Sequence, residues 1–181
     1  RITINFEQII HPLWGPERTV DVDGIPGPDV DVNGDVINHQ CTICHSPVAA
    51  DTTVQVPAGD LDLTDGASDE EPDHFRSYRE LLIGDIGQIV NDDGVLEDEC
   101  IETVVDPDTM VETCVAFRQV AAPMSGAGAR NSARFFDTME GRRVITVDHS
   151  DFMTPSELRL LSEWLDIGAQ YYNDPFAAPE N

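Results

Sequence analysis

Apolar residues recur at helical spacing near both ends of the chain. In the stretch 4–14 they fall on one face, and Asn5 with Gln8 three residues later has the form of a capping box. Near the other end, Thr154, Pro155 and Glu157 make a strong helix start, and the apolar face that follows ends at Gly168. The sequence therefore predicts a short helix from residue 4 and a longer one from residue 155 to residue 167.

Two further helices and a β-hairpin are expected between these ends. Helical patterns cover 74–83 and 129–139, whereas residues 95–120 show a β pattern on either side of a Pro107–Asp108 turn. Residues 15–40 are rich in glycine, proline and aspartate, which indicates a long acidic loop. A chain of 181 residues has the length of one domain, and we expect a single domain over 1–181.

The charge of the chain excludes some partners and favours others. Thirty-five acidic residues stand against ten basic ones, which gives a formal net charge of -25 at pH 7. Such a surface repels nucleic acid and attracts a protein with a basic surface. No apolar run approaches the roughly 18 residues of a membrane span. The acidic loops offer oxygen ligands, but the EF-hand pattern is missing, so solvated loops are expected rather than calcium sites.

The strongest chemical signal is the sequence Cys-Thr-Ile-Cys-His at positions 41–45. The thiols of Cys41 and Cys44, one helical turn apart, can add to the two vinyl groups of a porphyrin, and His45 then becomes the proximal ligand of the iron. A zinc half-site would require a second closely spaced pair, but the other two cysteines are 14 positions apart. A thioredoxin-like pair would require an α/β pattern, which the sequence lacks. The motif therefore predicts one covalently attached haem c.

Three other segments, 73–82, 129–136 and 158–175, resemble the C-terminal haem domain of proteins related to the hydrazine synthase alpha subunit. In those proteins a β-propeller precedes a cytochrome c module. No propeller pattern is present in these 181 residues, so hydrazine chemistry does not carry over. The resemblance implies a mainly α fold: a cytochrome c-like haem domain with long acidic loops and an inserted β-hairpin at 95–120. It also implies that the last helix packs across the first and shields a haem edge.

The occupant of the sixth position on the iron decides whether such a protein passes electrons or binds small molecules. His149 lies on the loop ahead of the last helix, where cytochromes c usually carry the distal ligand, and the resemblance also implies two histidine ligands. Met124, on a loop before another helix, is the alternative, and an open site is a third possibility. Two histidines predict a low-spin haem of low potential, whereas methionine raises the potential. Aromatic residues are expected to line the haem pocket, among them Phe135 and Tyr171 together with Tyr78, Phe136 and Tyr172.

The two remaining cysteines, Cys100 and Cys114, stand at mirror positions about residue 107 of the expected hairpin. Opposed residues on paired strands are close enough to be bridged, and haem c is attached in an oxidising compartment, so we expect a disulfide between them. The chain begins at Arg1 without a leader, which indicates either a mature form whose signal peptide was removed or a piece of a longer protein. We therefore expect a periplasmic or extracellular location.

Three functions agree with these features. The first, which we favour, is a monohaem c-type cytochrome that transfers electrons, is not an enzyme, and docks to a redox partner with a basic surface. The second is a haem enzyme or gas-binding sensor with an open sixth site, although the sequence marks no acid–base constellation for catalysis. The third is a haem-bearing subunit of a larger redox assembly, formed by self-association through the 15–40 loop and the hairpin.

Overall fold

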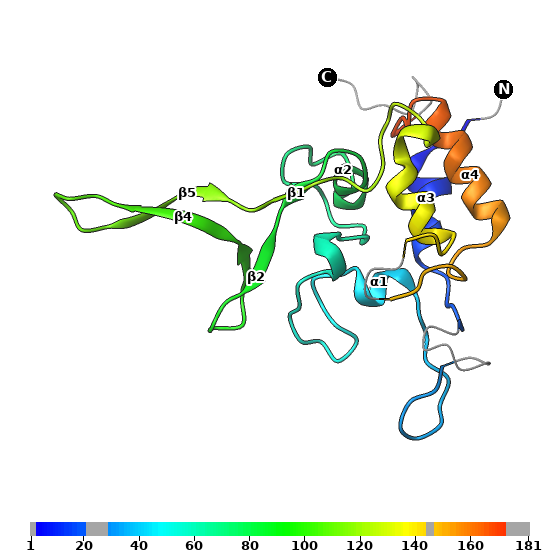
Figure 1. The fold of residues 1–181 in the computed structure, drawn as a ribbon, viewed down its shortest axis with the longest axis horizontal. Coiled ribbons are helices and arrows are strands. Elements are labelled where there is room, and N and C mark those ends of the chain that lie inside the picture. The colour runs from blue at the N-terminus through cyan, green and yellow to red at the C-terminus, as the bar shows by residue number, and fades with distance from the viewer. Residues whose placement is uncertain (1–2, 21–28, 144–146, 173–181) are drawn as a thin grey trace.

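The structure is a computed structural model that describes residues 3–20, 29–143 and 147–172. Helices account for 29% of these residues and strands for 18%. The prediction of a mainly α, cytochrome c-like fold is therefore wrong. The expected helices exist, but they are short and separated by long irregular segments, and the β structure extends beyond the single hairpin expected. Figure 1 shows the helices gathered at one side of the molecule and a two-stranded ribbon that extends far from them.

The first expected helix is irregular. Phe6–Ile10 forms a single π-helical turn, η1, and His11–Trp14 forms a 3-10 turn, η2. The Asn5 side chain caps the start by accepting a hydrogen bond from the backbone N–H of Gln8 at 3.1 Å. Pro12 lacks the N–H that would continue an α-helical ladder, so the chain tightens into the 3-10 turn at this point.

The helices expected at 74–83, at 129–139 and from residue 155 lie close to their predicted positions, and two further short helices, α1 (Cys41–Cys44) and the 3-10 turn η3 (Ala58–Asp60), occur as well. The expected ones are α2 (Arg76–Leu82), the 3-10 turn η4 (Ala129–Ser132), α3 (Ala133–Met139) and α4 (Pro155–Asp166). The start of α4 is the predicted capping box, in which Thr154 and Glu157 each satisfy a backbone N–H of the other. Gly168, which follows the helix, adopts a φ of 97° that favours glycine.

The strands form three separate antiparallel pairs. Their bounds are β1 (Asp85–Ile86), β2 (Gln88–Val90), β3 (Leu96–Asp98), β4 (Cys100–Val105), β5 (Glu112–Phe117) and β6 (Gln119–Val120). β4 pairs with β5, β2 with β3, and β1 with β6. The predicted hairpin at 95–120 is therefore present, but strand pairing begins ten residues earlier, at Asp85. We call the β4–β5 hairpin, residues 100–117, the arm.

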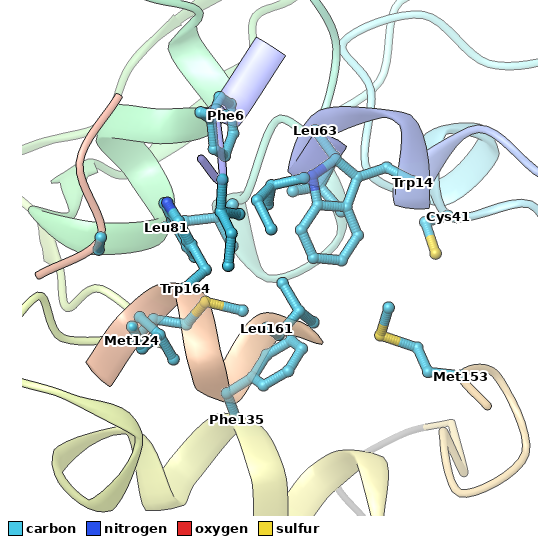
Figure 2. Close-up of a cluster of buried hydrophobic side chains, with 14 of the residues drawn as sticks. Phe6, Trp14, Cys41, Leu63, Leu81, Met124, Phe135, Met153, Leu161 and Trp164 are labelled. Atoms are coloured by element: carbon cyan, nitrogen blue, oxygen red, sulfur yellow. The ribbon is translucent and has the colours of Figure 1, made fainter. Parts of the chain in front are cut away.

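The core lies between the first and last helices. The Phe6 ring is centred 5.5 Å from the Trp164 ring of α4, and the Phe6 N–H donates to the Tyr171 carbonyl oxygen at 2.8 Å. The expectation that the last helix packs across the first is thus confirmed. Figure 2 shows the core side chains converging from η1, η2, α3 and α4, with Leu161 at their centre. Burial of this apolar surface is the main favourable term that holds the irregular segments together.

The acidic loop at 15–40 lies partly within the described residues, because residues 21–28 fall outside them. In the described part, Val30 and Val36 form an isolated antiparallel bridge. The Asp31 carboxylate accepts hydrogen bonds from the backbone N–H groups of Asn33 and Asp35, which lowers the pKa of Asp31. Within the described ranges, no group of three or more His, Cys, Asp or Glu side chains is placed to hold a metal ion, and no helix could cross a bilayer.

Candidate functional site

The predicted haem-binding motif forms α1 and its C-terminal cap. The backbone N–H of His45 donates to the Cys41 carbonyl oxygen at 2.9 Å and closes the helical turn. The His45 carbonyl oxygen in turn accepts from the N–H of Leu63 at 2.9 Å, which fixes the chain after the helix. Cys41 is buried, Cys44 is exposed, and both thiols are free. The turn places the two sulfur atoms three residues apart on a short rigid element, as attachment of one porphyrin requires.

The His45 imidazole is held in one orientation by the protein. Its Nδ1 lies 3.2 Å from the Leu61 carbonyl oxygen, and because a carbonyl only accepts, Nδ1 carries the proton and Nε2 is left to bind a ligand. Burial, together with the neighbouring His149, lowers the pKa of His45 to about 4, while the hydrogen bond to the Leu61 carbonyl acts in the opposite direction. The ring is therefore neutral near pH 7, which is the form that binds a metal ion.

His149 lies against His45 although the two are far apart in sequence. Their ring centroids are 6.4 Å apart, and the planes are inclined by 51°. Two imidazoles that share one metal ion, with bonds of about 2 Å each, have centroids roughly 6 Å apart. The Nδ1 atom of His149 donates to the Val147 carbonyl oxygen at 2.9 Å, so this ring also keeps Nε2 for a ligand. The His149 ring packs on Phe152, with centroids 4.9 Å apart.

Met124, the alternative distal ligand, occupies a different place. Its side chain is buried in the core, and its backbone N–H donates to the Leu81 carbonyl oxygen at 2.9 Å. In Figure 2 the Met124 side chain lies beside Trp164, at the opposite side of the core from Cys41. Of the two candidates, His149 is the one that the structure places against His45.

Of the aromatic residues predicted to line the haem pocket, Phe135 and Tyr171 are buried, whereas Tyr78, Phe136 and Tyr172 are partly buried. Phe135 faces Leu161 in the core, as Figure 2 shows. Tyr171 stacks on Phe6 with centroids 5.6 Å apart, and its hydroxyl donates to the Glu7 carboxylate at 2.7 Å. Burial and the Glu7 carboxylate both raise the pKa of Tyr171 above its usual value. These contacts give Tyr171 a role in joining the two ends of the chain, and its place in a haem pocket stays a prediction.

The surroundings of Cys41 contain polar groups that sequence reasoning missed. Arg18 lies beside the Cys41 thiol and donates to Glu157 at 3.0 Å and to the Leu13 carbonyl oxygen at 2.8 Å. Burial raises the pKa of Cys41, and the Arg18 guanidinium opposes this effect. Among the described residues, the buried Nε of Arg18 and Nε1 of Trp14 have no hydrogen-bond acceptor. Two unused donors near Cys41 match a group that carries carboxylates, such as haem with its propionates.

Two hollows flank the motif and the loop that follows His149. The larger has a volume of about 560 Å³ and lies between α3 and the start of α4, lined by residues that include Ser150, Met153 and Leu158. The smaller, about 270 Å³, lies between η2 and α1, with Gln40 and Thr42 in its wall. Figure 2 shows the Cys41 sulfur and the Met153 side chain directed toward one another. The residues that line the two hollows do not include Cys41, Cys44, His45 or His149, so both hollows lie beside the motif.

The predicted disulfide between Cys100 and Cys114 is confirmed. The sulfur atoms are bonded and the Cα atoms lie 5.9 Å apart, within the usual range for a bridge. The register differs from simple mirror symmetry, because Thr103 pairs with Cys114 and Cys100 pairs with Phe117. The pairs next to the turn, Val105 with Glu112 and Val104 with Thr113, already have this register, so the hairpin is centred between residues 108 and 109 and not at residue 107.

Comparisons of the chain with protein-family models, with curated proteins and with solved structures gave no match. The functional interpretation therefore depends on the motif, on the facing imidazoles and on their surroundings.

Proposed function

We propose that this protein is a c-type haem protein that transfers electrons, with Cys41 and Cys44 as the attachment sites, His45 as the proximal ligand and His149 as the distal ligand. The observation that carries the proposal is the pair of imidazoles with ring centroids 6.4 Å apart, of which His45 directly follows a Cys-x-x-Cys helix. Each ring has Nδ1 bound to a backbone carbonyl, which leaves both Nε2 atoms for one metal ion.

Each residue has a distinct role in this arrangement. The thiols fix the group covalently to α1, the Leu61 and Val147 carbonyls orient the two imidazoles, and Arg18 offers a charged donor at the edge of the site. When bound, haem supplies a one-electron redox couple whose potential the axial ligands set. If His45 and His149 both held the iron, no position would remain for a substrate, which favours electron transfer over catalysis.

The charge and the cysteine chemistry agree with this role. A net charge of -25 attracts a redox partner that has a basic surface, and that attraction weakens as salt shortens the screening length. The disulfide at Cys100–Cys114 is typical of oxidising compartments, where haem c is also attached. We therefore propose a periplasmic or extracellular location.

Two variants of the haem-loaded protein test the ligand assignment. We expect His149→Ala to convert the low-spin spectrum to a high-spin one and to permit rapid carbon monoxide binding by the reduced protein. The matched control is Met124→Leu, which conserves volume in the core and is expected to keep the wild-type spectrum. The wild-type protein should lack the weak charge-transfer band near the red edge that marks a methionine ligand.

The opposite pattern contradicts the assignment. If Met124→Leu abolishes that band and His149→Ala leaves the spectrum unchanged, methionine is the distal ligand. If the wild-type reduced protein binds carbon monoxide rapidly, the sixth position is open, and a gas-binding or catalytic function replaces the one proposed.

A second candidate, a haem-bearing subunit of a larger assembly, is favoured by one observation. Large apolar side chains on the arm are strongly exposed, among them Ile101, Val104, Met110 and Val115. Sedimentation of the intact protein over a range of salt concentrations tests this function. A monomer at all salt concentrations contradicts self-assembly, whereas oligomers that dissociate when Ile101 and Val115 are both changed to threonine support it.

A further inference from the structure

One peptide group connects the proposed proximal ligand to a buried carboxylate. The carbonyl oxygen of Leu61 accepts a hydrogen bond from Nδ1 of His45 at 3.2 Å. The N–H of the same amide, which belongs to Asp62, donates to the Glu80 carboxylate. A charge on Glu80 polarises this amide, so it strengthens the carbonyl as an acceptor for His45.

Glu80 is well placed to exchange a proton with solvent without touching either histidine. It lies on α2 with 6% of its surface exposed, and the Asp62 side chain beside it is also buried. The charged groups that face Glu80 are Asp62 from the loop after η3 and Asp85 from β1, and Arg76 of α2 reaches Asp62 at 3.9 Å. Asp85 is exposed, and its carboxylate lies near enough to Glu80 to raise the pKa of Glu80, so it offers a route between the buried carboxyl and water.

We propose that Glu80 is a positioning residue that tunes His45 through the Leu61–Asp62 peptide and takes up one proton when one electron is added to the site. This inference rests on the proposed function. The electron comes from the redox partner, the proton comes from water by way of Asp85, and an O–H bond forms on a Glu80 oxygen. Removal of the electron reverses the step, and the proton returns to solvent.

Electrostatics gives the direction of the coupling. An added electron increases the negative charge of the site and favours neutral Glu80. Ionised Glu80 draws on the Asp62 N–H, makes His45 a more electron-rich ligand and favours the oxidised state. Burial raises the pKa of Glu80 to about 8, with the Asp62 N–H opposing this rise and the Asp62 and Asp85 carboxylates adding to it. The coupling is therefore expected around neutral and mildly alkaline pH.

The test is a spectroelectrochemical titration of the haem-loaded protein between pH 5 and pH 10. In the wild type, the potential should fall as pH rises through the neutral range, by at most about 59 mV for each tenfold change in proton activity. Glu80→Gln keeps an acceptor for the Asp62 N–H but cannot ionise, so its potential should stay flat there and exceed the wild-type value at alkaline pH. Glu97→Gln, an exposed change on β3, should retain the wild-type profile.

Infrared spectra and a second variant test the role of Glu80 independently of the potential measured for Glu80→Gln. Infrared difference spectra should show a protonated carboxyl C=O band that appears on reduction and is absent in Glu80→Gln. If Glu80→Gln does not fold, Asp85→Asn serves instead, because loss of its negative charge should shift the pH-dependent range toward acid. A haem-loaded wild type with a pH-independent potential, or a Glu80→Gln variant with the wild-type profile, overturns this inference alone. A chain that carries no covalent haem overturns the proposed function instead.

Discussion

Leu161 in α4 has no exposed surface, whereas Val115 in β5 of the arm is 54% exposed. The same contrast holds for the neighbours of each residue. Leu165 and Trp164 are fully buried, whereas Val104 and Ile101 of the arm face solvent. The body, by which we mean the helices η1, η2, α1, α2, η4, α3 and α4 and the core that they enclose, is thus stabilised by apolar burial. A two-stranded ribbon with few apolar contacts is marginal by itself, so the arm depends on its strand hydrogen bonds and its disulfide.

The base of the arm is nevertheless tied to the loop that supports His45. Arg118, the residue after β5, pairs with Asp60 at 2.7 Å and with Glu99. The Asp60 carboxylate also accepts from the Gln88 N–H at 2.9 Å. Asp60 directly precedes Leu61, whose carbonyl orients the His45 ring. The ion pairs of Arg118 therefore connect the body, which is stabilised by apolar burial, to the arm, which is stabilised by its disulfide and its strand hydrogen bonds.

Substitution of the two cysteine pairs should have opposite effects on the covalent attachment of haem, and this is the largest difference that we expect between body and arm. Changing Cys41 and Cys44 to alanine removes both attachment points in the body, and we expect all haem to be extracted by acidified acetone. Changing Cys100 and Cys114 to serine affects only the arm and should leave covalent haem at the wild-type level. Haem loss in the arm variant, with retention in the body variant, would reverse the assignment of the two pairs.

Truncation of an apolar side chain should also lower the free energy of unfolding far more in the body than in the arm. Leu161→Ala creates a cavity in the core and should lower the free energy of unfolding by about 2–5 kcal/mol. Val115→Ala removes an exposed side chain and should change it by no more than about 0.5 kcal/mol. Urea unfolding followed by circular dichroism measures both. Equal losses would mean that the arm is packed in solution against something that buries it.

Buried and exposed carboxylates should respond differently to pH. Glu80 has a pKa raised from 4.5 to about 8, so folding favours its protonated form. Its contribution to stability is therefore complete below about pH 4.5 and is lost as pH rises through about 8, by on the order of a few kcal/mol. Glu80→Gln should remove this loss from the unfolding free energy measured against pH. Glu102→Gln on β4 should preserve it, and an unchanged profile in Glu80→Gln would contradict the assignment.

Loss of the disulfide should have a smaller and local effect. In the chain-entropy model, a disulfide that closes a loop of this length stabilises the folded state by roughly 3 kcal/mol. This free energy corresponds to about a hundredfold change in the equilibrium constant for unfolding of the arm. In Cys100→Ser/Cys114→Ser we expect amide hydrogen exchange to accelerate in β4 and β5 by up to that factor, with exchange in α4 unchanged. Equal acceleration in both regions would show that arm and body unfold together.

Local sequence signals predicted the elements well. The Thr154 and Glu157 cap, the start of α4 and the hairpin around residue 107 all depend on residues that are close in sequence. The disulfide was also predictable, because the two cysteines flank one turn. The fold class was wrong because short helices and additional strand pairs between Asp85 and Val120 leave too little helix for a cytochrome c-like fold.

The support of the site depends on contacts between distant segments. Arg18 reaches Glu157 across 139 positions, and Glu80 meets the Asp62 N–H across 18. Neither contact leaves a periodic signal, because each is a single long-range hydrogen bond made possible by the packing of other elements. His149 was predicted as a candidate from its position before the last helix, but its placement against His45 depended on the tertiary structure.

Covalent attachment of haem is tested most simply by the intact mass of the chain after maturation in an oxidising compartment, measured before and after extraction with acidified acetone. We predict a mass increase of one haem per chain that survives extraction and maps to the peptide containing Cys41 and Cys44. A chain with only its polypeptide mass, or one whose haem is fully removed by the extraction, would contradict the account.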